Sequence, residues 1–200
     1  MSQSSESNNK RIAKNTLLLY FRMLFMMVVS LYTSRVILNA LGVEDFGIYN
    51  VVGGIVVMLS FLNSSLTTST QRFLNYEMAN DNPRTLRVVF SNAEIAHFII
   101  AVISVLMIEI IGLWLLYNKL DIPNGQFNAA LWVFHFSVLS FFVTVISSPY
   151  NAAIIAHERM NVYAYFSILE VLLKLLSVYL LYIIPYNKLI VYGGLQLFIC

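Results

Sequence analysis

Two residues of opposite charge, Glu170 and Lys174, lie four positions apart in the middle of a long apolar run. Residues at i and i+4 share one face of a helix, so the two side chains can reach each other. Ionisable groups within a membrane span are costly and commonly mark a substrate or ion pathway. Two interpretations follow: a self-neutralised pair packed between helices, or a pair that lines a polar cavity.

Two arginines lie in the first apolar run of the chain. Arg22 lies roughly 7 Å from the centre of that run, where its guanidinium could bind a phosphate or an anionic headgroup. Long basic side chains also extend to the membrane interface, which is the alternative explanation for Arg22. Arg35 lies nearer the other end of the run, and its planar guanidinium suits a bidentate contact with pyrophosphate.

Three further ionisable side chains lie in the third apolar run, at Glu94, His97 and Glu109. Glu94 and His97 are three positions apart and therefore share a helix face. A carboxylate and an imidazole can relay protons or hold a coupling ion, although such a pair also suits a wet membrane interface. His135 stands alone in an aromatic stretch, and we expect a hydrogen-bonded core residue there.

The second apolar run is polar in its later half, and its polar side chains repeat at helical spacing. Asn63 and Thr67 share one face with Thr70, whereas Ser64 and Thr68 share another. Such a face either lines a cavity or packs closely against another membrane helix. We take Asn63 and Thr67 as candidate substrate contacts.

The composition indicates an integral membrane protein. Hydrophobic residues make up 59% of the 200 residues and charged residues only 11%, whereas a soluble domain is about half apolar and about a quarter charged. Apolar runs of roughly 20 residues can span a bilayer, and their continuity favours helices over a barrel. We predict an all-α polytopic bundle with five full spans, at 15–38, 47–69, 92–117, 129–148 and 162–184, and a sixth run from Leu189 to Cys200.

Other features exclude several functional classes. A net charge of +2 is too small to indicate a polyanionic partner such as nucleic acid. The sequence contains no phosphate-binding loop, no metal-ligand cluster and no nucleophile–base motif. We therefore predict neither an enzyme nor a bound cofactor or metal, and transport is favoured over chemistry.

The distribution of charge predicts how the chain sits in the membrane. Residues 1–14 are expected to be a disordered segment, which leaves 15–200 as the membrane bundle. With the N-terminus in the cytoplasm, seven of the twelve Lys and Arg residues fall inside and three outside, as membrane proteins prefer. The sixth run supplies only about 18 Å of helix, so we expect a piece of a longer chain. The alternative is a five-span protein whose last segment lies in the interface.

The first hairpin resembles that of a known transporter family. It reads RVILNALGVEDFGIYNVVGGIV from Arg35 to Val56, and it is similar to the first hairpin of bacterial oligosaccharide flippases of the Wzx-like type. These belong to the multidrug/oligosaccharidyl-lipid/polysaccharide exporter superfamily. The matching elements are an Arg, a Leu-Gly pair and a Phe-Gly-x-Tyr element, which here are Arg35, Leu41, Gly42, Phe46, Gly47 and Tyr49. Residues 70–73 and the connection 149–165 also look similar.

The resemblance implies the first lobe of a two-lobed, MATE-like transporter in the bacterial inner membrane. Its substrate would be an oligosaccharide linked to undecaprenyl pyrophosphate, exported for O-antigen or other surface polysaccharide. Its partners would include membrane lipid and a glycan polymerase or other polysaccharide-assembly proteins. Arg22, Arg35 and Lys174 are the candidate headgroup contacts, with Glu170 beside them.

Two other functions stay open from the sequence. One is a cation-coupled multidrug exporter of the same superfamily, in which acidic residues such as Glu94, Glu109 and Glu170 would bind the coupling ion. The other is a membrane scaffold for glycan-assembly enzymes that transports nothing itself.

Overall fold

The computed structural model describes the backbone of residues 2–80, 82–123, 125–184 and 187–200, and the side chains of these residues from Thr16 onward. The sequence also predicts turns at Asp81, Asn124 and Pro185, and its charge bias includes Lys10, Arg11 and Lys14. The three turn residues and the side chains of the three basic residues lie outside the described residues. The described part is helical and contains no strand. Its helices are α1 (Ser2–Val57), α2 (Ser60–Ala79), α3 (Pro83–Asn118), α4 (Phe127–Ala156), α5 (Met160–Leu180) and α6 (Lys188–Ile199).

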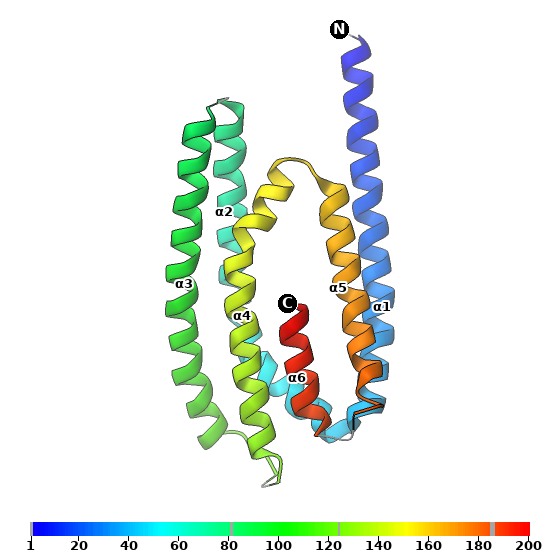
Figure 1. Ribbon diagram of the computed structural model, residues 1–200, viewed down its shortest axis with the longest axis vertical. Coiled ribbons are helices and arrows are strands. Elements are labelled where there is room, and N and C mark those ends of the chain that lie inside the picture. Colours follow the sequence, from blue (N-terminus) through cyan, green and yellow to red (C-terminus); the bar gives the residue numbers. More distant parts are fainter. Residues whose placement is uncertain (1, 81, 124, 185–186) are drawn as a thin grey trace.

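Helix α1 is two helices joined at Gly42, whose φ of 85° and ψ of 170° leave the helical region. Glycine adopts a positive φ without steric strain, because it has no Cβ. The Nζ of Lys188 donates to the carbonyl of Ala40 at 3.2 Å, which satisfies one of the carbonyls that the break leaves without a helical partner. Beyond Gly42 the chain runs along the end of the bundle opposite the N-terminus and leads to α2 (Figure 1).

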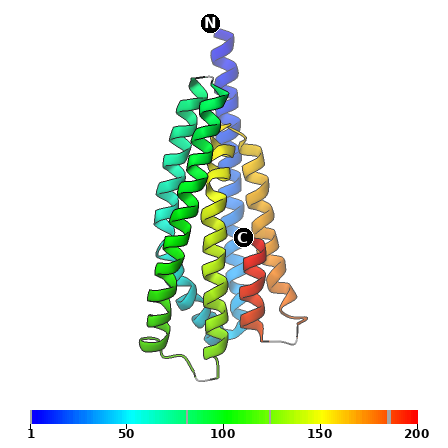
Figure 2. The same cartoon turned by 60° about the vertical axis from the view of Figure 1, so that its left-hand side comes forward.

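The helices then alternate in direction along the long axis of the bundle. The N-terminus, the α2–α3 turn and the α4–α5 turn lie at one end, and the α3–α4 and α5–α6 connections lie at the other (Figure 1). Figure 2 shows the start of α1 extending beyond the other helices at the N-terminal end. Arg84 and Arg87 lie in the first turns of α3 and Arg159 directly precedes α5, so these three residues share that end, as the predicted orientation requires. The identity of the cytoplasmic side stays a prediction.

Among the described residues, four helices are long and apolar enough to cross a bilayer: Thr16–Val57, Pro83–Asn118, Phe127–Ala156 and Met160–Leu180. The predicted all-helical, membrane-type fold is confirmed at this level, but the chain divides its apolar runs differently from the prediction. The second predicted run, 47–69, is shared between the end of α1 and the start of α2, with a turn at Met58 and Leu59. The run from Leu189 lies in α6, which has 12 residues.

Two predicted boundaries also differ from the structure. We expected Pro149 to close the fourth span, whereas α4 continues through Pro149 to Ala156. A proline inside a well-packed helix removes one hydrogen bond and bends the helix without ending it, and Figure 1 shows α4 bending near its upper end. Residues 2–14, expected to be disordered, continue α1, because extending an existing helix adds hydrogen bonds without a new nucleation step.

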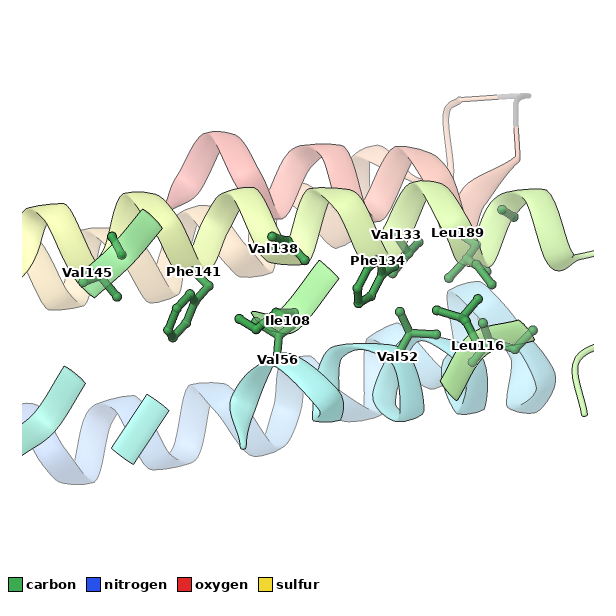
Figure 3. Close-up of a cluster of buried hydrophobic side chains, with 14 residues drawn as sticks. Val52, Val56, Ile108, Leu116, Val133, Phe134, Val138, Phe141, Val145 and Leu189 are labelled. Atoms are coloured by element: carbon green, nitrogen blue, oxygen red, sulfur yellow. The ribbon is translucent and has the colours of Figure 1, made fainter. Parts of the chain in front are cut away.

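Helix α4 is the centre of the bundle and packs against each of the other five helices. Phe134 of α4 is fully buried among Val52 and Val56 of α1, Ile108 and Leu116 of α3, and Leu189 of α6 (Figure 3). Helix α3 makes room for this ring at Gly112, where a Cβ would lie 2.4 Å from two Phe134 ring carbons. The close approach of α3 to α4 therefore depends on the absence of a side chain at residue 112.

We predict that Gly112→Ala destabilises the bundle, because overpacking a buried site costs about 1–3 kcal/mol and exceeds the gain in helix propensity. Gly54→Ala is the matched control, since an added Cβ there meets no atom within 4 Å. Thermal unfolding in detergent should show a lower midpoint for Gly112→Ala only, with partial recovery when Phe134→Leu is added. Equal midpoints for the two alanine variants would contradict the packing described here.

Candidate functional site

Helix α4 presents a row of hydroxyl side chains toward α5 and α6. Ser137, Ser140 and Thr144 each donate to the backbone carbonyl four residues earlier, at 2.8, 2.9 and 2.8 Å. Their hydrogens are thus satisfied within the helix, while their oxygen lone pairs remain able to accept hydrogen bonds. An apolar helix can carry a polar stripe in this way without leaving a donor unsatisfied.

These hydroxyls line a cavity of about 310 Å³ that is bordered by residues of α1, α2, α4, α5 and α6 and that we call the polar cavity. Ligand cavities in proteins are typically about 300–1,000 Å³, so the polar cavity is large enough to hold a small polar group. Its lining side chains that carry nitrogen or oxygen are Tyr49, Ser60, Asn63, Ser137, Ser140, Thr144, Glu170, Lys174 and Gln196.

The ion pair predicted from the sequence forms one wall of the polar cavity. Lys174 Nζ donates to Glu170 Oε1 at 2.6 Å, and the Lys174 and Glu170 side chains are 40% and 44% exposed. Such exposure is incompatible with a pair sealed between packed helices. The structure therefore favours the cavity interpretation, and the exposure also means that the pair itself contributes little stability.

The opposite wall positions Asn63 through a contact between helices. Ser148 Oγ of α4 lies 2.7 Å from Asn63 Oδ1 of α2, which fixes the amide at the edge of the polar cavity. Gln196 Nε2 of α6 donates to Ser177 Oγ of α5 at 3.4 Å. Thr67, which we grouped with Asn63, is not on the cavity wall; its hydroxyl donates to the Asn63 carbonyl at 2.8 Å.

A second cavity of about 510 Å³ adjoins the polar cavity and shares Glu170 with it. We call it the Arg22 cavity, because Arg22 of α1 lines it together with Tyr150 and Asn151 of α4 and Tyr163 of α5. Arg22 Cζ lies 4.2 Å from the centre of the Tyr163 ring, and its Nε is buried without a hydrogen-bond partner among the described residues. The guanidinium is therefore held against α5 by a cation–π contact.

The structure thus gathers four of the six predicted substrate contacts around two adjoining cavities: Arg22, Asn63, Glu170 and Lys174. Arg35 is exposed on α1 and lines neither cavity. Its predicted headgroup contact rested on its place in the first apolar run, and position in a run does not determine which face of the helix points inward.

The three predicted coupling residues do not form one site. Glu94 accepts a hydrogen bond from the Tyr150 hydroxyl of α4. His97 is only 1% exposed, and its Nδ1 lies 2.8 Å from the Ala93 carbonyl. Glu109 lies 15 residues beyond Glu94 on α3, about 22 Å along the helix axis. Among the described residues there is also no group of three His, Cys, Asp or Glu side chains that could hold a metal ion.

The prediction for His135 is wrong. His135 is 48% exposed, and its Nδ1 lies 3.1 Å from Oε1 of Glu109 on the neighbouring helix. The two residues are 26 positions apart, so no helical spacing in the sequence could have paired them. The same is true of Tyr163 and Tyr150, which hold Arg22 and Glu94 from other helices.

We predict that the polar cavity admits water from at least one side of the membrane. In a Cys200→Ser background, Ser137→Cys should react with a charged, membrane-impermeant thiol reagent, because residue 137 lines the cavity. Leu139→Cys is the matched control two residues away on α4, outside the cavity lining. Labelling in membrane vesicles should be rapid for the first variant and slow for the second. Equal labelling of the two would mean that the cavity is closed to water.

Comparison with known proteins adds no further assignment for these residues. No family model, no curated protein and no solved structure matches the chain. The flippase resemblance of the first hairpin therefore stays a prediction, and the two adjoining cavities are the observation from which a function must be argued.

Proposed function

We propose that this bundle is a lobe of a membrane transporter that moves a lipid-linked oligosaccharide with a pyrophosphate headgroup across the bilayer. The observation that carries the proposal is the pair of adjoining cavities within an apolar bundle. One contains Arg22, the other contains Lys174, and both are bordered by Glu170. The resemblance of the first hairpin to oligosaccharide flippases supports the same substrate class.

The physical problem for such a substrate is its charge. A pyrophosphate cannot enter hydrocarbon without groups that replace its hydration. Arg22 has no carboxylate partner among the described residues, and the Tyr163 ring contacts one face of its guanidinium. Its N–H donors other than Nε therefore remain available to phosphate oxygens, for which a guanidinium is geometrically suited.

Lys174 supplies a second cation in a form that can persist without substrate. Its ammonium is neutralised by Glu170 at 2.6 Å, which lowers the energy of holding a charge at mid-helix. When a phosphate approaches, the ammonium can rotate toward it, since the Lys174 and Glu170 side chains are 40% and 44% exposed. The hydroxyl and amide groups of the polar cavity offer acceptors and donors to sugar hydroxyls.

The two alternative functions fit this geometry less well. A cation-coupled exporter would need acidic groups that converge on an ion, whereas Glu94 and Glu109 are about 22 Å apart on α3 and Glu170 is already paired with Lys174. A scaffold that transports nothing would have no use for a charged cavity within its membrane helices. We therefore favour the flippase.

The test is translocation of a fluorescent polyprenyl-pyrophosphate oligosaccharide in vesicles that contain the protein in its natural full length. We expect Arg22→Gln and Lys174→Gln each to reduce the rate about tenfold or more, because a charge-assisted hydrogen bond contributes about 1.5–3 kcal/mol. Arg35→Gln should retain a rate near that of the wild type, since Arg35 lines neither cavity.

Each outcome bears on a separate part of the proposal. An unchanged rate in both cavity variants would mean that the headgroup passes elsewhere. Absence of translocation by the wild-type protein, together with cation-dependent drug efflux from the same vesicles, would favour the exporter.

A further inference from the structure

The hydrogen-bonded pair of Glu109 and His135 lies on the side of α4 that faces away from the polar cavity. At 100° per residue, His135 is about 140–180° around the helix from Ser140 and Thr144, which line that cavity. The Glu109 and His135 side chains are 30% and 48% exposed. The α3–α4 seam therefore carries an exposed polar pair on the outer surface of the bundle.

This pair is surrounded by apolar surface at a depth where hydrocarbon is expected. Glu109 lies about 13 Å along α3 from Asn118, and His135 lies about 12 Å along α4 from Phe127. Leu106, Trp132 and Leu139 flank the pair and are 48–58% exposed. We call these three residues, with Glu109 and His135, the α3–α4 face.

The pair retains unused hydrogen-bonding capacity on this face. The internal contact joins His135 Nδ1 to Glu109 Oε1, which leaves His135 Nε2 and Glu109 Oε2 directed to no described partner. Lipid tails cannot satisfy either atom, and polar groups exposed to hydrocarbon are unfavourable. A protein surface that covers this face must offer both a carboxylate oxygen and an imidazole nitrogen, or groups equivalent to them.

We propose that the α3–α4 face binds a second copy of this chain through a two-fold axis along the membrane normal. Such an axis keeps every residue at its own depth, and Glu109 and His135 lie at the same depth on neighbouring helices. Rotation about an axis that lies between the two copies would therefore place each Glu109 against the partner's His135. In its protonated form an imidazole donates from both nitrogens, so four hydrogen bonds would close a ring of zero net charge.

The apolar residues of the α3–α4 face fit the same arrangement. A two-fold interface brings the same surface patch together from both copies, so α3 of each copy would face α4 of the other. Leu106 and Leu139 lie about 18 Å along their helices from Asn118 and Phe127. Leu106 of each copy would therefore pack against Leu139 of the other, and Trp132 would pack against α3 of the other. No residue of the α3–α4 face lines the polar cavity or the Arg22 cavity, so both cavities would stay free. Dimerisation is thus independent of the transport proposal, and either can fail without the other.

The experiment measures cross-linking between copies of the full chain in liposomes at low protein-to-lipid ratio. In a Cys200→Ser background, Leu139→Cys with a short bifunctional maleimide should yield predominantly dimer. Leu172→Cys on α5 is the matched control, because this side chain is similarly exposed at 44% and lies outside the α3–α4 face. The control should yield only the background expected from random collision.

Two further variants test the role of the polar pair. Glu109→Leu with His135→Leu should weaken the dimer about tenfold or more, since interhelical hydrogen bonds are lost. The thermal midpoint of this variant in detergent reports whether the bundle still folds. Glu109→His with His135→Glu exchanges the pair and should keep the dimer, because the ring of hydrogen bonds can form again.

The proposal is overturned if Leu139→Cys cross-links no more than Leu172→Cys, which would mean that lipid or a different protein covers the α3–α4 face. It is also overturned if the folded double-leucine variant dimerises as strongly as the wild type. Retention of dimer in the exchanged variant, with loss in the double-leucine variant, would establish the interface.

Discussion

Hydrocarbon offers no hydrogen-bond partner, so every polar side chain within these helices must find its partner in the protein or in a water-filled space. The structure meets this constraint in three ways. Hydroxyls on α2, α4 and α5 donate hydrogen bonds to carbonyls of their own helix, as Ser137 and Ser167 do. Glu170 neutralises Lys174 within one turn of α5. Ser148 reaches across to Asn63, and Tyr150 reaches across to Glu94.

The packing around α4 determines where these partners meet. Phe134 fills the space that Gly112 leaves open on α3, so α3 and α4 approach closely on one side of the bundle. On the other side, Ser137, Ser140 and Thr144 of α4 line the polar cavity together with residues of α5 and α6. One helix thereby has a tightly packed apolar face, a polar face toward the cavity and, at its edge, the exposed His135.

Arg22 illustrates why a charge in a membrane helix cannot be interpreted from its own helix alone. From α1 by itself, an arginine in the first half of a span has a simple explanation in which the side chain extends to the interface. The ring of Tyr163 on α5 holds the guanidinium at 4.2 Å beside the Arg22 cavity. That contact, together with the sharing of Glu170 between the two cavities, is what turns separate charged residues into one candidate site.

Features that depend on neighbours in the chain could be predicted from the sequence, because helical geometry relates them directly. The apolar runs predicted an all-helical membrane fold, and the i,i+4 spacing of Glu170 and Lys174 predicted their contact. The polar half of the second run made Asn63 and Thr67 candidates for a cavity wall or a closely packed helix face, but it could not separate the two residues. The prediction that the fourth span ends at Pro149 was wrong. It used only the local preference of proline, whereas packing on both sides of Pro149 keeps α4 helical to Ala156.

Contacts between helices were decided only by the tertiary structure. Helical periodicity says which residues share a face, but the rotation of each helix results from the packing of all its side chains at once. This is why Arg35 points outward while Arg22 borders a cavity, and why Glu94 and His97, which share a helix, have separate partners. It is also why His135, a lone core residue by its sequence, is an exposed partner of Glu109: its environment is built by α3, and no local pattern encodes how α3 and α4 are aligned.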